Sequence, residues 1–202
     1  GDIAMNHRIT GPAALTAGML GLLAAQPALA QGPNWTWIDA AYQLVDFDDV
    51  DEEADVLELD GSWAATDLVH VFAGYRNGEV DTRSGDPDID EFELGIGVNP
   101  QLTETVDLYG RVGWATAEID FGGFDDVDDD GFTLAAGLRA MVLPRWELNG
   151  GMRYVDLGED ETELTLGTVY NFTPRFAVTG DVAFGDEATT WGIGVRFYPN
   201  RR

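Results

Sequence analysis

The residues with the clearest capacity for chemistry are aspartates at alternate positions. Asp126, Asp128 and Asp130 are separated by single residues, and Gly131 follows them. Alternate carboxylates before a turn glycine form the first half of a calcium-binding loop, in which they surround a hard cation. The twelfth position of such a loop is Gly137 instead of glutamate. The pattern therefore indicates a solvated acidic loop, with weak binding of Ca²⁺ or Mg²⁺ there as a hypothesis and no metal site assigned firmly.

Histidine is the second residue type that could carry chemistry, because it commonly serves as the base beside a nucleophile or a water. His70 is the one histidine that follows the first thirty residues, and Val71 and Phe72 come directly after it. It lies in a stretch where apolar and polar residues alternate, which predicts a structural position inside a strand. We therefore expect no catalytic residue and no enzymatic activity.

Composition excludes further classes of function. The 202 residues contain 37 acidic and 11 basic side chains, all of the latter arginine, and the formal net charge is −26. Binding to nucleic acid depends on cationic side chains that neutralise phosphates, so nucleic acid is not an expected partner. Cysteine is absent, which excludes disulfides and thiolate metal sites. The length suits a single domain.

The first thirty residues resemble a leader for secretion. Met5 begins a short polar, weakly basic stretch, an apolar run follows at about 13–23, and Ala28, Leu29 and Ala30 form a small-residue ending. This is the pattern of a cleavable signal peptide, and the run is too short to span a bilayer as a helix. We predict that residues 1–4 lie ahead of the start, that 5–30 are the signal peptide and that 31–202 form the mature domain.

From Trp35 onward the chain alternates with a period of two. Val69, Val71, Ala73 and Tyr75, for example, are separated by polar or small residues. This periodicity predicts strands with one apolar face. Ten segments show it: 35–47, 55–66, 68–78, 90–99, 105–119, 131–143, 146–156, 163–172, 175–185 and 189–198. Acidic connections alternate with short turns, three of which contain proline, so we predict an all-β, closed antiparallel barrel of ten strands, with eight as the alternative.

Two features indicate that the apolar face meets lipid and the polar face lines a lumen. The polar face is rich in glycine, which weakens an exposed strand but suits a crowded interior. Apolar-face aromatics gather at the strand ends, as in the girdles of a transmembrane barrel. They are Tyr75, Phe92, Trp114, Phe132, Tyr154, Phe184 and Trp191 at the acidic end, and Trp35, Trp37, Trp146, Phe172, Phe176 and Phe197 at the short-turn end.

The last strand carries a resemblance to a known family. Thr190, Gly192, Val195 and Phe197 resemble the C-terminal assembly signal of Gram-negative outer-membrane proteins, and Pro199–Arg202 follow where relatives usually end on the aromatic residue. Residues 31–198 are similar to the small outer-membrane barrels of the outer membrane protein A, X and W type. The resemblance implies a Gram-negative outer-membrane location, periplasmic turns and extracellular acidic loops. It also implies contact with membrane lipid, lipopolysaccharide and the barrel assembly machinery. We expect a monomer.

Charged residues recur on the predicted inward face. They are Arg76, Arg111, Arg139, Arg153, Arg196, Asp39, Glu58, Asp60, Glu93, Asp107, Glu147 and Asp181. Buried charges without partners are costly, so we predict that these residues pair in a network that largely occludes the lumen. The expected role is structural or in surface interaction. The alternatives are a narrow porin-like channel for small solutes or cations and, less favoured, a soluble periplasmic β-barrel binding protein.

Overall fold

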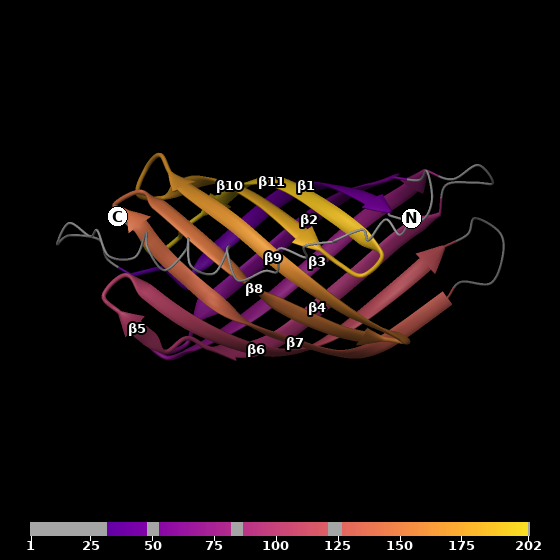
Figure 1. Cartoon of the computed structure of the whole chain (residues 1–202), viewed down its shortest axis with the longest axis horizontal. Helices are drawn as coiled ribbons and strands as arrows, with labels where there is room; N and C mark the ends of the chain where they lie inside the picture. Colours follow the sequence, from indigo (N-terminus) through magenta and orange to yellow (C-terminus); the bar gives the residue numbers. More distant parts are fainter. Residues whose placement is uncertain (1–31, 48–52, 82–86, 121–126, 202) are drawn as a thin grey trace, which may run out of the picture.

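The computed structural model describes residues 32–47, 53–81, 87–120 and 127–201. The strands are β1 (Trp37–Phe47), β2 (Glu53–Ala64), β3 (Val69–Asp81), β4 (Asp88–Val98), β5 (Gln101–Thr103), β6 (Val106–Asp120), β7 (Val127–Leu143), β8 (Trp146–Leu157), β9 (Glu159–Asn171), β10 (Phe176–Phe184) and β11 (Ala188–Phe197). Figure 1 shows them tilted around one barrel. No helix in these ranges has the length and hydropathy needed to cross a membrane.

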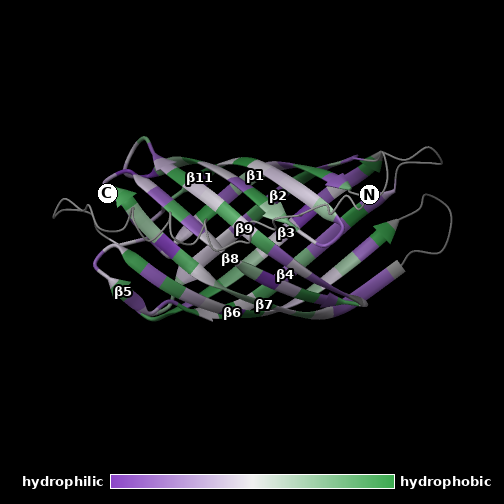
Figure 2. Cartoon of the chain, in the orientation of Figure 1, coloured by the Kyte–Doolittle hydropathy of each residue, from purple (hydrophilic) through white to green (hydrophobic). Residues whose placement is uncertain are grey.

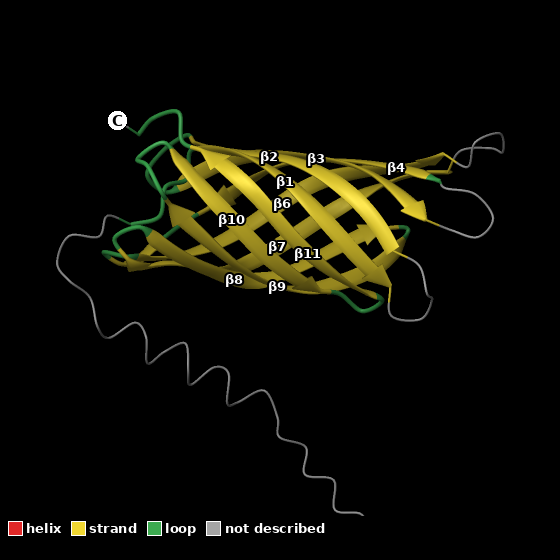
Figure 3. Ribbon diagram, turned by 90° about the horizontal axis from the view of Figure 1, so that it is seen from above, coloured by secondary structure: helices red, strands yellow, loops and turns green. Residues whose placement is uncertain are grey.

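The strands form one closed antiparallel barrel. Apart from β5, each strand pairs with its neighbours in the chain, with β4 pairing directly with β6, and β1 closes the barrel by pairing with β11. The three-residue β5 pairs only with β6, inside the turn between β4 and β6. The wall therefore has ten strands, which confirms the predicted fold class and strand number. The connections between β2 and β3, β4 and β6, β7 and β8, and β9 and β10 are short and lie at one end, beside residue 201 (Figure 3).

Side chains alternate between the two faces of the wall. Leu57, Leu94, Ile96 and Ile193 are among the outward residues and are 53–63% exposed, although they are strongly apolar. Figure 2 shows hydrophobic and hydrophilic residues alternating along the strands. A soluble protein would hide such a face, whereas a barrel in a membrane presents it to lipid. The polar face is turned inward, as the sequence predicts.

Several strands extend further than the sequence indicates. The predicted strand 131–143 begins at Val127 in β7, and the predicted strand 163–172 begins at Glu159 in β9. In β7 the added residues pair with Glu118 and its neighbours on β6. Alternation of hydropathy ends where the apolar face ends, but backbone pairing continues beyond that point because its hydrogen bonds do not depend on side-chain polarity.

The prediction that Trp35 and Trp37 belong to an outward aromatic girdle is wrong. Both side chains turn into the barrel, where they are 5% and 6% exposed. Trp37 shares the inward face of β1 with Asp39, while Ile38 and Tyr42 point outward. Because successive side chains of a strand alternate, the outward position of Ile38 requires Trp37 to point inward. Trp146, Phe172 and Phe176 at the same end are outward.

Candidate functional site

The inward face encloses a cavity of about 480 Å³, to which every strand of the ten-stranded wall contributes. Its lining extends from Phe47, Ile89 and Ala188 at the acidic end to Trp37 and Arg139 near the short turns. Most of the predicted inward charges line it. The barrel lumen is therefore the candidate site, and its contents decide whether anything can enter or pass.

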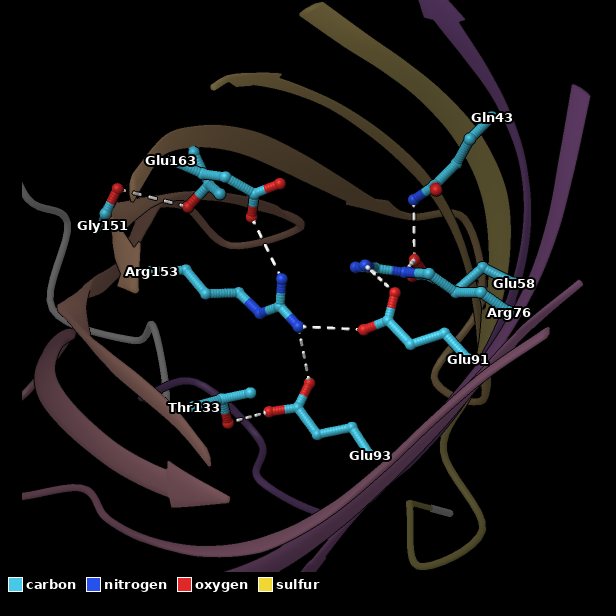
Figure 4. Close-up of polar contacts among 10 residues, drawn as sticks. Gln43, Glu58, Arg76, Glu91, Glu93, Thr133, Gly151, Arg153 and Glu163 are labelled. Carbon is cyan, nitrogen blue, oxygen red and sulfur yellow. Dashed lines mark hydrogen bonds and ion pairs between the residues drawn. The ribbon is translucent and has the colours of Figure 1, made fainter. Parts of the chain in front are cut away.

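Two arginines organise the acidic half of the lumen (Figure 4). Arg153 on β8 lies 3.2 Å from Glu91 and 3.2 Å from Glu93, both on β4, and 3.3 Å from Glu163 on β9. Arg76 on β3 lies 2.8 Å from Glu58 on β2 and 3.3 Å from Glu91. Since β6 and β7 separate β4 from β8 in the wall, Arg153 bridges the lumen. Glu91 is shared by both arginines and joins the two groups into one network.

Two further ion pairs lie nearer the short turns. Arg139 contacts Glu147 with two nitrogens, at 2.7 and 3.1 Å, and both side chains are almost completely buried. Arg196 lies 2.8 Å from Asp39, which also accepts a hydrogen bond from Thr179 at 3.3 Å. Bidentate contact of an arginine with a carboxylate is among the stronger polar interactions in proteins. These pairs hold β7 to β8 and β11 to β1 from the inside.

Trp35 fills the short-turn end of the lumen. It precedes β1, and its indole Nε1 donates to Asp107 at 2.7 Å. Its ring stacks on His70 with a centroid separation of 4.5 Å, and the Arg139 guanidinium lies 4.4 Å from its centroid. Asp107 therefore accepts from tryptophan instead of pairing with an arginine. Residues from an irregular segment and from β3, β6 and β7 close this end together.

His70 has both ring nitrogens engaged. Arg111 Nε donates to His70 Nε2 at 3.1 Å, so the Nδ1 proton is directed at the side-chain oxygen of Asn99, 2.9 Å away. Arg111 makes no ion pair with a carboxylate of the described residues, and its guanidinium lies 4.9 Å from the Phe72 ring centroid. A fully buried histidine in this arrangement has no free nitrogen to act as a base. This geometry suits a structural position.

The residues after β11 fold over the same end. Tyr198 is completely buried, and the Arg201 guanidinium lies 4.1 Å from its ring centroid. Arg201 also donates to Asn171 at 3.0 Å and accepts from Arg175 through its carbonyl oxygen at 2.9 Å. Asn34 and Asn200 hydrogen-bond at 3.0 Å, so the segment before β1 meets the segment after β11. The sequence pattern does not indicate this contact.

The predicted network is thus assembled with some changes. Of its twelve members, Arg76, Arg139, Arg153 and Arg196 pair with Glu58, Glu147, Glu93 and Asp39, whereas Asp60 and Asp181 line the cavity without an ion pair in the described part of the chain. Glu91 and Glu163 also pair with arginines, although the predicted network does not include them. Glu91 is two residues from Glu93, and Glu163 is two residues from Thr165. Residues two apart in a strand share one face, so this spacing indicates that both glutamates point inward.

Outward aromatics near the acidic end donate hydrogen bonds to aspartates on the paired strand. The pairs are Tyr42 with Asp55, Tyr75 with Asp90, Trp114 with Asp130 and Tyr154 with Asp160. They occur in four of the five hairpins at that end. Each pair provides a polar contact for a carboxylate beside an aromatic ring, an arrangement suited to a membrane–water interface.

The hypothesis of a divalent cation near Asp128 stays a prediction. Asp126 lies outside the described residues, while Asp128 and Asp130 are exposed on the outward face of β7. Asp130 accepts a hydrogen bond from Trp114 at 3.4 Å. Within the described ranges, no group of three or more histidine, aspartate or glutamate side chains is arranged to hold a metal ion.

Comparison with known proteins supplies a family. The model of the outer membrane protein beta-barrel domain matches residues 15–172. No curated protein matches the chain. The translocator domain of the autotransporter NalP from Neisseria meningitidis is similar in structure, with a TM-score of 0.51, 12% identity, and coverage of 92% of this chain and 96% of that one.

Two other solved structures are similar over a smaller share of this chain. A KdgM porin in complex with disordered oligogalacturonate has a TM-score of 0.49 and 8% identity, and the match covers 80% of this chain and 98% of that one. OprG from Pseudomonas aeruginosa has a TM-score of 0.45 and 14% identity, and the match covers 84% of this chain and 98% of that one. Identities this low describe the fold alone.

Proposed function

Because the chain belongs to the outer membrane protein beta-barrel domain family, which implies a Gram-negative outer-membrane location, we propose that it is an integral barrel with a structural or surface-interaction role and a lumen closed to ions. The outward apolar residues lie in lipid, the short turns face the periplasm and the acidic connections face outside. The role is not enzymatic, since His70, the one histidine in the described part, has both ring nitrogens engaged.

The filled short-turn end is the observation that carries the closed lumen. Trp35, His70, Asp107, Arg139 and Glu147 are all 5% exposed or less. Side chains packed to this degree support a lumen closed to hydrated ions. In the other half, the cross-lumen contacts of Arg153 narrow the path further. The two obstructions lie one behind the other along the barrel.

The surface role rests on the acidic end. The aspartates that accept hydrogen bonds from outward aromatic residues lie at the level of the lipid headgroups, where the membrane meets water. Further acidic residues precede and follow them in the sequence. Lipopolysaccharide phosphates would repel this rim unless Mg²⁺ or Ca²⁺ bridges the two, so the partner we propose is cation-bridged lipopolysaccharide. In addition, β11, with Thr190, Gly192, Val195 and Phe197, serves as the strand that the barrel assembly machinery reads. The barrel functions as a monomer.

A narrow channel for small solutes or cations is the second candidate. The cavity of about 480 Å³ favours it, because Asp60 and Asp181 line it without an arginine partner in the described residues. Their charge would attract cations entering from the acidic end. Passage would require an opening at Trp35.

Planar-bilayer recording of the refolded protein tests the proposal. Heat-modifiable gel mobility first establishes that the barrel is folded, and a detergent-only addition is the control. We expect no stable conductance steps from the wild-type chain. Large, stable steps would overturn the closed lumen and favour the channel. Folding and solubility without detergent or lipid would instead favour the soluble periplasmic barrel.

A further inference from the structure

The segment Pro33–Thr36 precedes the first strand of the wall. Pro33, Trp35 and Thr36 are buried, while Asn34 bonds Asn200 at the exposed end. Ser62 Oγ donates to the Trp35 carbonyl oxygen at 2.8 Å, and the Ala64 amide donates to Thr36 Oγ1 at 3.1 Å. Strand pairing begins only at Trp37, opposite Ser62. The segment is therefore held by side-chain contacts, and it can leave the lumen without breaking a pair of strands.

The cavity ends where Trp35 begins. Arg139, Tyr109 and Arg111 line the cavity and also surround the Trp35 ring. The distances to the Trp35 ring centroid are 4.4 Å from the Arg139 guanidinium, 6.0 Å from the Tyr109 ring centroid and 5.9 Å from the Arg111 guanidinium. Trp35 itself does not line the cavity. The lumen behind the indole is already hollow, so this one side chain and the residues clamped around it form the main obstruction. The indole therefore lies between the cavity and the filled short-turn end.

The closed arrangement leaves polar atoms unsatisfied. Three buried donors have no acceptor among the described residues: Trp37 Nε1, Arg139 Nη1 and Tyr198 Oη. All three belong to inward side chains near the short turns. Trp37 and Arg139 also line the cavity, so these groups lie at the boundary between the hollow part of the lumen and its filled end.

We propose that Pro33–Thr36 is a releasable plug, anchored by Trp35, and that its departure converts the closed barrel into a water-filled pore. The inference rests on the closed lumen proposed above and adds the element that closes it. Asp107, His70 and Arg139 form the socket for the indole. The Asn34–Asn200 hydrogen bond tethers the plug to the segment that folds over the same end.

Conductance of a Trp35→Ala variant tests the plug. Trp63→Ala is the matched control, because Trp63 is also a tryptophan but points outward and is 60% exposed. We expect Trp35→Ala to raise open probability about tenfold or more over wild type and over Trp63→Ala. This ratio corresponds to about 1.4 kcal/mol in the equilibrium between closed and open states. Folded Trp35→Ala that conducts no more than Trp63→Ala would overturn the plug.

A second measurement does not depend on conductance. The chain has no cysteine, so Thr36→Cys introduces a unique thiol on the plug, at a position that is 3% exposed. A membrane-impermeant maleimide should modify this thiol slowly in refolded vesicles. We expect modification about tenfold faster when Trp35→Ala is added, and unchanged when Trp63→Ala is added. Equal rates in the two backgrounds would show that Trp35 does not hold the segment.

The outcomes separate the two proposals. If wild type conducts but Trp35→Ala still multiplies the open probability and the rate of thiol modification, the closed lumen fails and the plug stands. If wild type is closed and Trp35→Ala changes neither quantity, the closed lumen stands and the plug fails.

Discussion

Arg153 on β8 and Glu93 on β4 lie 3.2 Å apart across the lumen, although two strands of the wall separate β8 from β4. The same guanidinium reaches Glu91 on β4 and Glu163 on β9. A barrel wall holds neighbouring strands by backbone hydrogen bonds, but strands on opposite sides touch only through side chains. Arg153 thus joins two strands that do not pair directly with each other in the sheet.

Arg153→Ala should enlarge the pore only when the plug is also removed. Alone, the variant leaves Trp35 in place, and we expect conductance as low as in wild type. Combined with Trp35→Ala, it removes the cross-lumen contacts and should raise the conductance of each open step about twofold, since conductance follows the width of the water path. Bilayer recording checks this. Conductance of Arg153→Ala alone equal to that of the double variant would contradict the two-obstruction arrangement.

Arg139→Ala should destabilise the barrel strongly. The change leaves Glu147, which is completely buried, without its cation. Breaking a buried pair by removing one partner typically costs about 3–5 kcal/mol. The measurement is the free energy of unfolding in urea with lipid vesicles. Arg145→Ala, in the exposed turn between β7 and β8, is the control and should change it by no more than about 0.5 kcal/mol. Equal stability of the two variants would show that the pair contributes nothing.

Glu91→Gln should weaken the network more than Asp181→Asn. Glu91 contacts both Arg76 and Arg153, whereas Asp181 makes no ion pair in the described part of the chain. We expect Glu91→Gln to lower the free energy of unfolding by about 1–3 kcal/mol, as for loss of a charged hydrogen-bond partner. Asp181→Asn should leave it unchanged or raise it slightly. Urea unfolding monitored by tryptophan fluorescence distinguishes the variants, and the reverse order would contradict this assignment.

Gly137→Ala should be destabilising while Gly110→Ala is tolerated. A Cβ on Gly137 would overlap the carbonyl oxygen of Gly150 and lie 2.6 Å from Tyr109 Oη, inside the lumen. A Cβ on Gly110, on the neighbouring strand, would have Val98 Cγ2 at 3.9 Å as its nearest neighbour. Overpacking of this kind costs about 1–3 kcal/mol. Heat-modifiable mobility over a temperature series measures the difference, and equal transition temperatures would be the contrary result.

Calcium should bind the acidic end weakly. Asp128 and Asp130 would supply part of a ligand set, and the net charge of −26 favours cations in general. We expect calorimetric titration to give a dissociation constant of about 1 mM, in the range of low-affinity extracellular sites. Asp130→Asn should weaken it, while Asp181→Asn should not. Absence of both calcium heat and a calcium effect on the melting temperature would reject the hypothesis.

The sequence by itself determined the wall of this barrel. Period-two alternation, as in Val69–Tyr75, assigned the strands and their outward faces, and the alternation of turns with acidic connections set the strand number at ten. These features are local, because each depends only on whether a side chain meets lipid or lumen. Residues two apart in a strand point to the same side, so the positions of Glu93 and Thr165 also place Glu91 and Glu163 inward.

Only the tertiary structure decided what fills the lumen. The contact of Arg153 with Glu93, the position of Trp35 against His70 and the meeting of Asn34 with Asn200 each join residues at least 35 positions apart in the sequence. Periodicity states that a side chain points inward but not which side chain it meets, because that depends on strand stagger and barrel curvature. Trp35 shows the limit most clearly, since it lies before the first strand, where no alternation constrains it.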